Sequence, residues 1–483
     1  MRTSRRQNRS GLAPLITLIA LLLSVLSGCE FIPGGAAAAT PTPTRIIQSA
    51  TRRFLLEYSY VHATPTAAPI LQTSVIALDA YTGALLWRHA LEKPGAITIN
   101  ALQQPFERDG VVYVIFHYDT QSAISRGVLE ALAVESGQTL WRHETDGEIA
   151  GPPAVDGARV YLSSAGLRSI QPPFETKQSV VEALNTHDGS LRWSATVDGA
   201  VGAPTVAGGL IYLFARPVPL QSNVSGTGNL LALKSGDGAV AWLYNSPEPL
   251  GGQRNGQSSS PLVVDERVYA YAIERDPNGV VNPLLLAFGA RDGAALWRYK
   301  TGGITFMPAF AANIMCVSTR LNSALNSASA VVGLNIADGS VRWRVESEGL
   351  ASPCVTDGER FYLTHTGKKG GVRAFSVADG HTLWDATSGD PVIANGLIPV
   401  SLSSGLVAAY IASPSAADVR DTKLVVARAS DGKQVWNYLV PGRAEDAPQI
   451  DGDVVYAPVD QELLAFSLRD GKALWRYQTV RRS

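Results

Sequence analysis

Cysteine is scarce in this chain, with three residues among 483, and charge is scarce as well, because charged residues make up only 17%. Three cysteines exclude a disulfide-stapled scaffold and a multi-cysteine cluster. The 41 basic residues nearly balance the 42 acidic ones, so the basic excess of nucleic-acid-binding proteins is missing and we expect no nucleic-acid partner. A hydrophobic content of 46% still allows a sizeable core, which excludes a disordered chain.

The motifs of common catalytic sites are also missing. The sequence contains no Gly-x-Ser-x-Gly elbow, Walker sequence, His-Glu-x-x-His helix or Cys-x-x-Cys-His haem attachment site. Its seven histidines are dispersed without metal-ligand spacing, and His89 and His143, which each follow a Trp-Arg pair, are expected to be exposed. We therefore expect a protein that is not an enzyme, with no catalytic residue, metal or cofactor.

The first 28 residues have the features of an export signal. Four arginines precede an apolar run, residues 12–26, that is too short to span a bilayer comfortably. The run ends in Leu26-Ser27-Gly28-Cys29, which resembles the lipobox of bacterial lipoproteins. This resemblance implies that Cys29 is lipidated and becomes the mature N-terminus; an uncleaved anchor helix is the alternative. Both interpretations place the body of the protein outside the cytoplasm.

The segment after Cys29 has the composition of a flexible tether. Its run of alanines and its Thr-Pro repeat, residues 36–44, cannot form a core and are typical of a semi-extended linker. We therefore expect three regions: a lipoprotein signal peptide over 1–28, the lipidated Cys29 with its tether over 29–52, and a folded body over 53–483.

One motif recurs through this body. Every tryptophan lies four residues after a glycine, as Trp297 does after Gly293, and successive tryptophans are 39–55 residues apart. This period is typical of β-propeller blades. Seven of the nine glycines follow Asp, a dipeptide typical of hairpin turns because glycine tolerates a positive φ. We expect the tryptophans to wedge adjacent blades together; they are Trp87, Trp141, Trp193, Trp242, Trp297, Trp343, Trp384, Trp436 and Trp475.

The residues before each glycine complete a four-stranded unit. A β-rich run with a small residue, such as 284–287, precedes the glycine, and most units add two strands upstream, such as 154–157 and 160–162. Eight units are complete, and a partial one surrounds residues 75–87. The sequence therefore predicts an all-β fold, a single β-propeller of eight four-stranded blades. The partial unit and the strand-like segment 54–60 would pair at the seam to close the ring, with nine blades as the alternative.

The repeat resembles a known family. Ala77-x-Asp79-x-x-Thr82-Gly83-x-x-x-Trp87 is similar to the tryptophan-docking motif of PQQ-like, quinoprotein-type propeller repeats, and the resemblance covers about residues 70–478. That family includes quinone-dependent alcohol dehydrogenases and BamB, a non-enzymatic lipoprotein of the machinery that inserts outer-membrane β-barrels. The resemblance implies the propeller fold and leaves the choice between these functions open.

The two remaining cysteines bear on that choice. The resemblance implies that the dehydrogenases hold their quinone with calcium, a catalytic Asp and often a disulfide between adjacent cysteines, and this chain has no adjacent cysteines. Cys316 stands in the position that Tyr161 fills in another unit. We expect Cys316 and Cys354 to be buried thiols, with a disulfide between them as the alternative that an oxidising compartment would allow.

Turn lengths distinguish the two faces of the predicted ring. With the strands of a blade named A to D outward, the A–B and C–D turns share one face and are short. The B–C turns and D–A crossings share the other face, here called the long-loop face, and are long: residues 117–127, 165–178, 216–229, 245–259, 274–282, 320–329 and 413–422. Long loops on a rigid scaffold commonly carry binding residues. The candidate partner-binding residues, which can contact peptide or carboxylate groups, are Phe174, Arg216, Arg254, Arg275, Arg320 and Arg420.

These observations predict a membrane-anchored, extracytoplasmic propeller that acts as a non-catalytic protein-interaction scaffold similar to BamB. It would be a monomer that binds a protein or an envelope polymer through the long-loop face and reaches the membrane through the lipid on Cys29. The alternatives are a PQQ- and calcium-dependent oxidoreductase and a sensor of small ligands. The sequence leaves open whether the envelope has one membrane or two.

Overall fold

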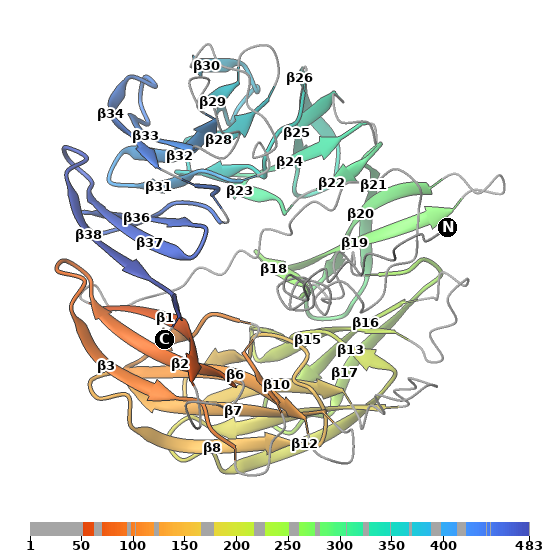
Figure 1. Cartoon of the computed structure of the whole chain (residues 1–483). Coiled ribbons are helices and arrows are strands. Elements are labelled where there is room, and N and C mark those ends of the chain that lie inside the picture. Colours follow the sequence, from red (N-terminus) through yellow and green to blue (C-terminus); the bar gives the residue numbers. More distant parts are fainter. Residues whose placement is uncertain are drawn as a thin grey trace, which may run out of the picture.

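The strands of the body form a ring of sheets. The computed structural model describes residues 52–61, 70–93, 98–101, 103–119, 125–165, 178–216, 228–250, 260–275, 281–305, 307–321, 328–347, 349–366, 370–387, 398–412, 422–440, 442–444 and 446–482. Within these ranges the strands form nine sheets, here called blades 1 to 9 in chain order. Figure 1 shows the blades following one another around the ring, with the first next to the last. The all-β propeller is confirmed, and the prediction of eight blades is wrong.

The first three blades are built from the N-terminal third of the body and one C-terminal strand. Blade 1 comprises β1 (Arg52–Val61), β2 (Ile70–Asp79), β3 (Leu85–Ala90) and β39 (Val480–Arg482). Blade 2 comprises β4 (Thr98–Asn100), β5 (Phe106–Arg108), β6 (Val111–Asp119), β7 (Ser125–Ala133) and β8 (Thr139–Thr145). Blade 3 comprises β9 (Ala154–Asp156), β10 (Arg159–Ala165), β11 (Gln178–Asn185) and β12 (Leu191–Asp198).

Blades 4 to 6 follow the same order. Blade 4 comprises β13 (Ala200–Val201), β14 (Thr205–Ala207), β15 (Leu210–Arg216), β16 (Gly228–Lys234) and β17 (Val240–Ser246). Blade 5 comprises β18 (Leu262–Val264), β19 (Arg267–Arg275), β20 (Val281–Gly289) and β21 (Ala295–Lys300). Blade 6 comprises β22 (Ile304–Thr305), β23 (Ala309–Ala311), β24 (Ile314–Arg320), β25 (Ser329–Asn335) and β26 (Val341–Ser347).

The last three blades have four strands each. Blade 7 comprises β27 (Val355–Thr356), β28 (Arg360–His365), β29 (Gly371–Ser376) and β30 (Thr382–Thr387). Blade 8 comprises β31 (Ser401–Ser403), β32 (Leu406–Ala412), β33 (Thr422–Arg428) and β34 (Gln434–Val440). Blade 9 comprises β35 (Gln449–Asp451), β36 (Val454–Val459), β37 (Glu462–Ser467) and β38 (Ala473–Gln478).

The ninth blade results from the way the chain ends meet. The N-terminal strands β1, β2 and β3 form an antiparallel sheet, and the C-terminal strand β39 pairs parallel to β1, with Val480 opposite Tyr58. The partial unit is therefore a complete blade whose innermost strand comes from the other end of the chain. The two paired segments are more than 400 residues apart, so the spacing of the repeat does not indicate that they pair. For this reason the unit around residues 75–87 looked incomplete in the sequence.

Polar side chains reinforce this seam between blades 1 and 9. Arg53, which is 4% exposed, lies with its guanidinium carbon 4.7 Å from the ring centre of Tyr456 and donates a hydrogen bond to Gln449. Glu57 is 2% exposed and accepts hydrogen bonds from Arg88 at 2.6 Å and from Tyr477 at 2.5 Å. A buried arginine and a buried glutamate thus each have partners, as buried charges require.

The hydrophobic core is divided among the interfaces between blades. Nine clusters of buried apolar side chains occur among the described residues, and each draws from two neighbouring blades. One of them joins blade 1 to blade 9 through Ile76 and Tyr456, among others. The core therefore continues around the ring without a gap at the seam, and burial between blades is what holds the sheets together.

Each tryptophan of the repeat lies at one of these interfaces. The indole lies against the glycine of the following blade, so that a Cβ added to Gly137 would be 2.4 Å from the ring of Trp87. The indole N–H donates to a carbonyl of that blade's C–D turn, for example from Trp297 to Ile336 at 3.0 Å. A small residue such as Ala287 stands opposite the tryptophan, and the register shifts directly after it. The glycine, the small residue and the tryptophan thus form one packing unit.

None of the described residues forms a helix long and apolar enough to cross a membrane. The signal peptide and tether that the sequence predicts, residues 1–28 and 29–52, lie outside the described residues except for Arg52, which begins β1.

Candidate functional site

The B strands of blades 4, 5 and 6 end in arginines on the long-loop face. Arg216 ends β15, Arg275 ends β19 and Arg320 ends β24. Three of the predicted partner-binding residues are therefore at the same end of three consecutive blades. The other three lie outside the described residues: Phe174, Arg254 and Arg420.

These arginines differ in how far they reach solvent. In the sheet of blade 4, the backbone of Arg216 lies opposite Ala200 of β13. In the sheet of blade 6, the backbone of Arg320 lies opposite Ile304 of β22 in the same way. Arg216 is partly buried, and this burial lowers the pKa of its guanidinium. Arg320 is 8% exposed, whereas Arg275 is exposed. Arg275 is thus the most accessible of the three to a partner on this face.

An ion-pair network lies beside Arg275. Its neighbour Glu274 contacts Lys300 at 2.8 Å and Arg298 at 3.1 Å, and Arg298 also contacts Glu248 at 3.0 Å. Because these side chains are partly exposed, the network adds little to the free energy of folding. It balances the charge of Glu274 within the blade and joins the crossing after β17 to the outer strand of blade 5.

Two histidines pair with glutamates of the next blade, contrary to the expectation that they are exposed. His89 lies 3.3 Å from Glu130, and His143 lies 3.1 Å from Glu182. Each histidine is 17% exposed. Burial alone would raise the pKa of Glu130, but the adjacent imidazole of His89 and a hydrogen bond from the Thr139 hydroxyl lower it below its usual value. These pairs have no local signal in the sequence because each one joins two different blades.

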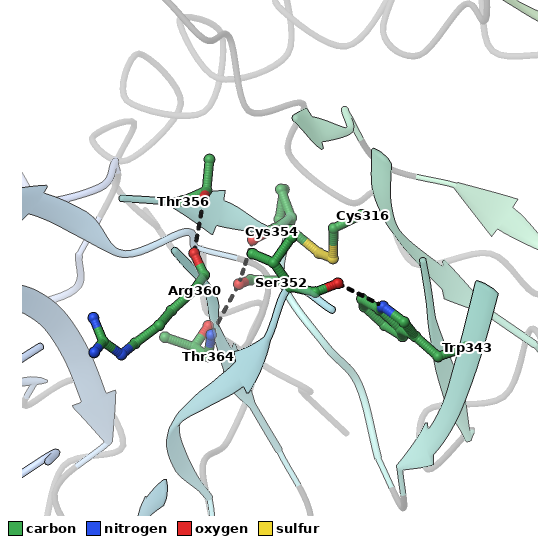
Figure 2. The surroundings of a disulfide bond; sticks show 9 residues. Cys316, Trp343, Ser352, Cys354, Thr356, Arg360 and Thr364 are labelled. Carbon is green, nitrogen blue, oxygen red and sulfur yellow. Dashed lines mark hydrogen bonds between the residues drawn. A yellow bond between two sulfur atoms is a disulfide. The ribbon is translucent and has the colours of Figure 1, made fainter. Parts of the chain in front are cut away.

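A disulfide joins blades 6 and 7, which corrects the expectation of two buried thiols. Cys316 on β24 is bonded to Cys354, which directly precedes β27, with the Cα atoms 6.2 Å apart. The two residues are 0% and 6% exposed and belong to the same apolar cluster as Trp343. Figure 2 shows this bond between Cys316 and Cys354 together with the nearby Trp343. It is a covalent link between neighbouring blades, 38 residues apart in sequence.

A cavity of about 550 Å³ lies between the same two blades, on the face that carries the short A–B and C–D turns. In blades 3, 4, 7 and 9 a tyrosine occupies the position that corresponds to Cys316. Its hydroxyl donates a hydrogen bond to the same backbone carbonyl of the next blade that accepts one from the tryptophan. Tyr362 and Trp384, for example, both donate to the carbonyl of Ala429. In blade 6 the equivalent carbonyl belongs to Val377, which accepts from Trp343 and lines the cavity. In blade 6 the position that carries the tyrosine in those blades is Cys316, which stands opposite Gly333.

Part of the donor set that the resemblance implies for the quinone enzymes is not seen among the described residues. None of their His, Cys, Asp and Glu side chains gather in a group of three or more that could hold a metal ion. The disulfide joins residues on neighbouring blades and not adjacent cysteines.

The fold and this face define a class: a closed propeller of Gly-x-x-x-Trp repeats with its longer connections on one side. A family model described as outer membrane protein assembly factor BamB matches residues 125–272, 219–356, 279–408 and 368–483. These matches cover more than half of the chain, which therefore belongs to the family of outer membrane protein assembly factor BamB.

The relatives with similar sequences include an outer-membrane assembly factor and a dehydrogenase. Outer membrane protein assembly factor BamB of Yersinia pestis is 23% identical over 307 residues, which are 59% of this chain and 69% of that protein. Polyvinylalcohol dehydrogenase of a Pseudomonas species is 24% identical over 463 residues, which are 85% of this chain and 68% of that protein. Among solved structures, one titled as the eukaryotic initiation factor has a TM-score of 0.53 at 11% identity and covers 89% of this chain and 99% of its own, a likeness of fold alone.

Proposed function

We propose that this protein is a membrane-anchored, extracytoplasmic scaffold that binds partner proteins through its long-loop face and catalyses no reaction. The observation that carries the proposal is the match of the repeats to the BamB family over residues 125–483. The name of the Yersinia relative, an outer membrane protein assembly factor, points to partners in an outer-membrane envelope. A scaffold needs a rigid body and an accessible face, and the strand ends of blades 4 to 6, where Arg275 is exposed, offer such a face.

Replacing both Arg216 and Arg275 by Glu should weaken partner binding. The change reverses two charges at the ends of β15 and β19, so contacts with carboxylate or carbonyl groups of a partner become repulsive or are lost. The measurement is capture of envelope proteins by the full chain after photocrosslinking from the long-loop face. Arg291→Glu is the matched control, because Arg291 is 83% exposed on a C–D turn of the other face. Capture of the same proteins at unchanged yield by the double variant would contradict the proposal.

The dehydrogenase relative makes a quinone enzyme the second candidate, because its match covers 85% of this chain. A calorimetric titration of the full chain with pyrroloquinoline quinone, with and without calcium, separates the two functions. If the protein is a non-catalytic scaffold, we expect no binding of pyrroloquinoline quinone under either condition. Tight, calcium-dependent binding would overturn the non-catalytic part of the proposal and direct attention to carboxylates near the ring centre.

Membrane attachment through Cys29 is the remaining part of the proposal. Cys29 lies outside the described residues, and the lipobox-like sequence before it supports lipidation. Cys29→Ala should release the protein from the membrane fraction or leave an unprocessed precursor, since a thiol-linked lipid supplies the apolar area that holds the chain at a bilayer. Fractionation of envelopes followed by immunodetection measures this. A variant that sediments with membranes and is processed as the wild type is would show that Cys29 is not the anchor.

A further inference from the structure

Among the described residues, the outermost strand of every blade has no strand paired on its outer side, and most of these edges carry charge. Each D strand is the terminal strand of its sheet: β3, β8, β12, β17, β21, β26, β30, β34 and β38. Unpaired backbone groups on such an edge can pair with another strand, and charged side chains commonly prevent this. Seven of the nine D strands carry at least one charged residue, whereas β17 and β34 carry none.

The side chains of β34 alternate between the side that faces blade 9 and the opposite side. On the first side Trp436 is 8% exposed and lies against Gly471, whereas Tyr438 is 39% exposed and its ring is tilted against that of Phe466, with ring centres 4.7 Å apart. On the other side Val435 is 43% exposed, Leu439 is 50% exposed, and Asn437 is exposed between them. The edge of blade 8 therefore presents an apolar, polar, apolar row with no charge.

We propose that β34 pairs antiparallel with β34 of a second copy of this chain, so that the protein is a dimer and not the monomer expected from its sequence. Pairing centred on Asn437 would place Val435 opposite Leu439 of the other copy at both ends, and Asn437 opposite Asn437 in the middle. Two apolar pairs would flank one amide pair, and no like charges would meet. The strand thus matches itself under a two-fold axis, which is the commonest symmetry of protein dimers.

The other uncharged edge matches itself less well. In β17 the exposed row consists of Ala241, Leu243 and Asn245. Pairing centred on Leu243 would place the apolar Ala241 opposite the polar Asn245 at both ends, so a single apolar pair remains. The comparison favours β34 as the dimer contact. It also supplies a control strand without charges.

The geometry of the pairing gives a covalent test in the full chain. Residues directly opposite each other in an antiparallel pair have Cα atoms about 4.5–5.5 Å apart, within the range that a disulfide bridges. Asn437→Cys should therefore link two copies in the oxidising envelope, seen as a band of twice the monomer mass on a non-reducing gel. Arg344→Cys is the matched control, because it lies on β26 at the same position, one residue after the tryptophan. The other two body cysteines are already bonded to each other.

A second substitution separates specific pairing from chance collision. We expect Leu439→Lys, combined with Asn437→Cys, to lower the yield of linked dimer about tenfold. Because the dimer has a two-fold axis, the substitution places one lysine from each copy in the contact. Leu243→Lys on β17 should leave that yield unchanged. Two results would overturn the proposal: linkage of Asn437→Cys no greater than that of Arg344→Cys, or linkage to a protein of different mass, which would mean that β34 receives a strand from another partner.

Discussion

Replacing Trp297 by Ala is expected to destabilise the ring by about 3–5 kcal/mol. The indole packs between its own blade and Gly339 of blade 6, and its N–H donates to Ile336 at 3.0 Å. Alanine removes most of the apolar area buried at this interface and leaves a void that the two sheets cannot close without moving. The measurement is the denaturant midpoint, with the slope of the transition checked for constancy.

Two further variants identify the origin of that loss. Leu296, the preceding residue, is 46% exposed, and Leu296→Ala should change the stability by no more than about 0.5 kcal/mol. Trp297→Phe keeps an aromatic ring but loses the N–H donor, so its effect should be intermediate, with about 1 kcal/mol from the hydrogen bond. If Trp297→Ala costs no more than Leu296→Ala, the tryptophan does not join the blades.

Removing the disulfide is the second substitution with a large expected effect. Cys316→Ala combined with Cys354→Ala should lower the stability by about 3–4 kcal/mol, because the bridge closes a loop of 38 residues in the unfolded chain. The loss should be comparable with that of one tryptophan. The bridge lies in the cluster that contains Trp343, so blades 6 and 7 are held by both.

The same change can be made chemically in the wild type. Unfolding in the presence of a thiol reductant should shift the midpoint of the wild type to that of the double variant and leave the variant unaffected. Titration of thiols in the unfolded, unreduced body provides the direct count. Two reactive thiols from Cys316 and Cys354 would show that the bridge is absent and would restore the original expectation for these residues.

The repeat made most of the fold predictable. The glycine four residues before each tryptophan fixes a turn, and the small residue in the preceding strand leaves room for the indole, so local spacing alone indicated blades of antiparallel strands. The sequence contains nine tryptophans, one for each blade. The predicted number of blades was nevertheless wrong, because the innermost strand of blade 1 is β39 and pairing between the two chain ends has no local signal in the sequence.

The candidate site was predictable only as a face. Loop lengths identified the side of the ring that carries the long connections, and Arg216, Arg275 and Arg320 end strands on that side. The sequence could not tell that Arg320 is buried while Arg275 is exposed, because this depends on which crossing packs beside each strand end. The use of this face by a partner remains a prediction.

By itself the sequence determined the secondary structure, the repeat and the family, since these follow from turn chemistry and residue spacing within one blade. The tertiary structure decided the contacts between blades that do not recur in every unit: the closure of the ninth blade, the disulfide between Cys316 and Cys354, and the pairing of His89 with Glu130. The tryptophan contacts follow a fixed period along the chain, so the sequence could predict them. The other contacts depend on single residues of two separate sheets, which become neighbours only in the folded ring.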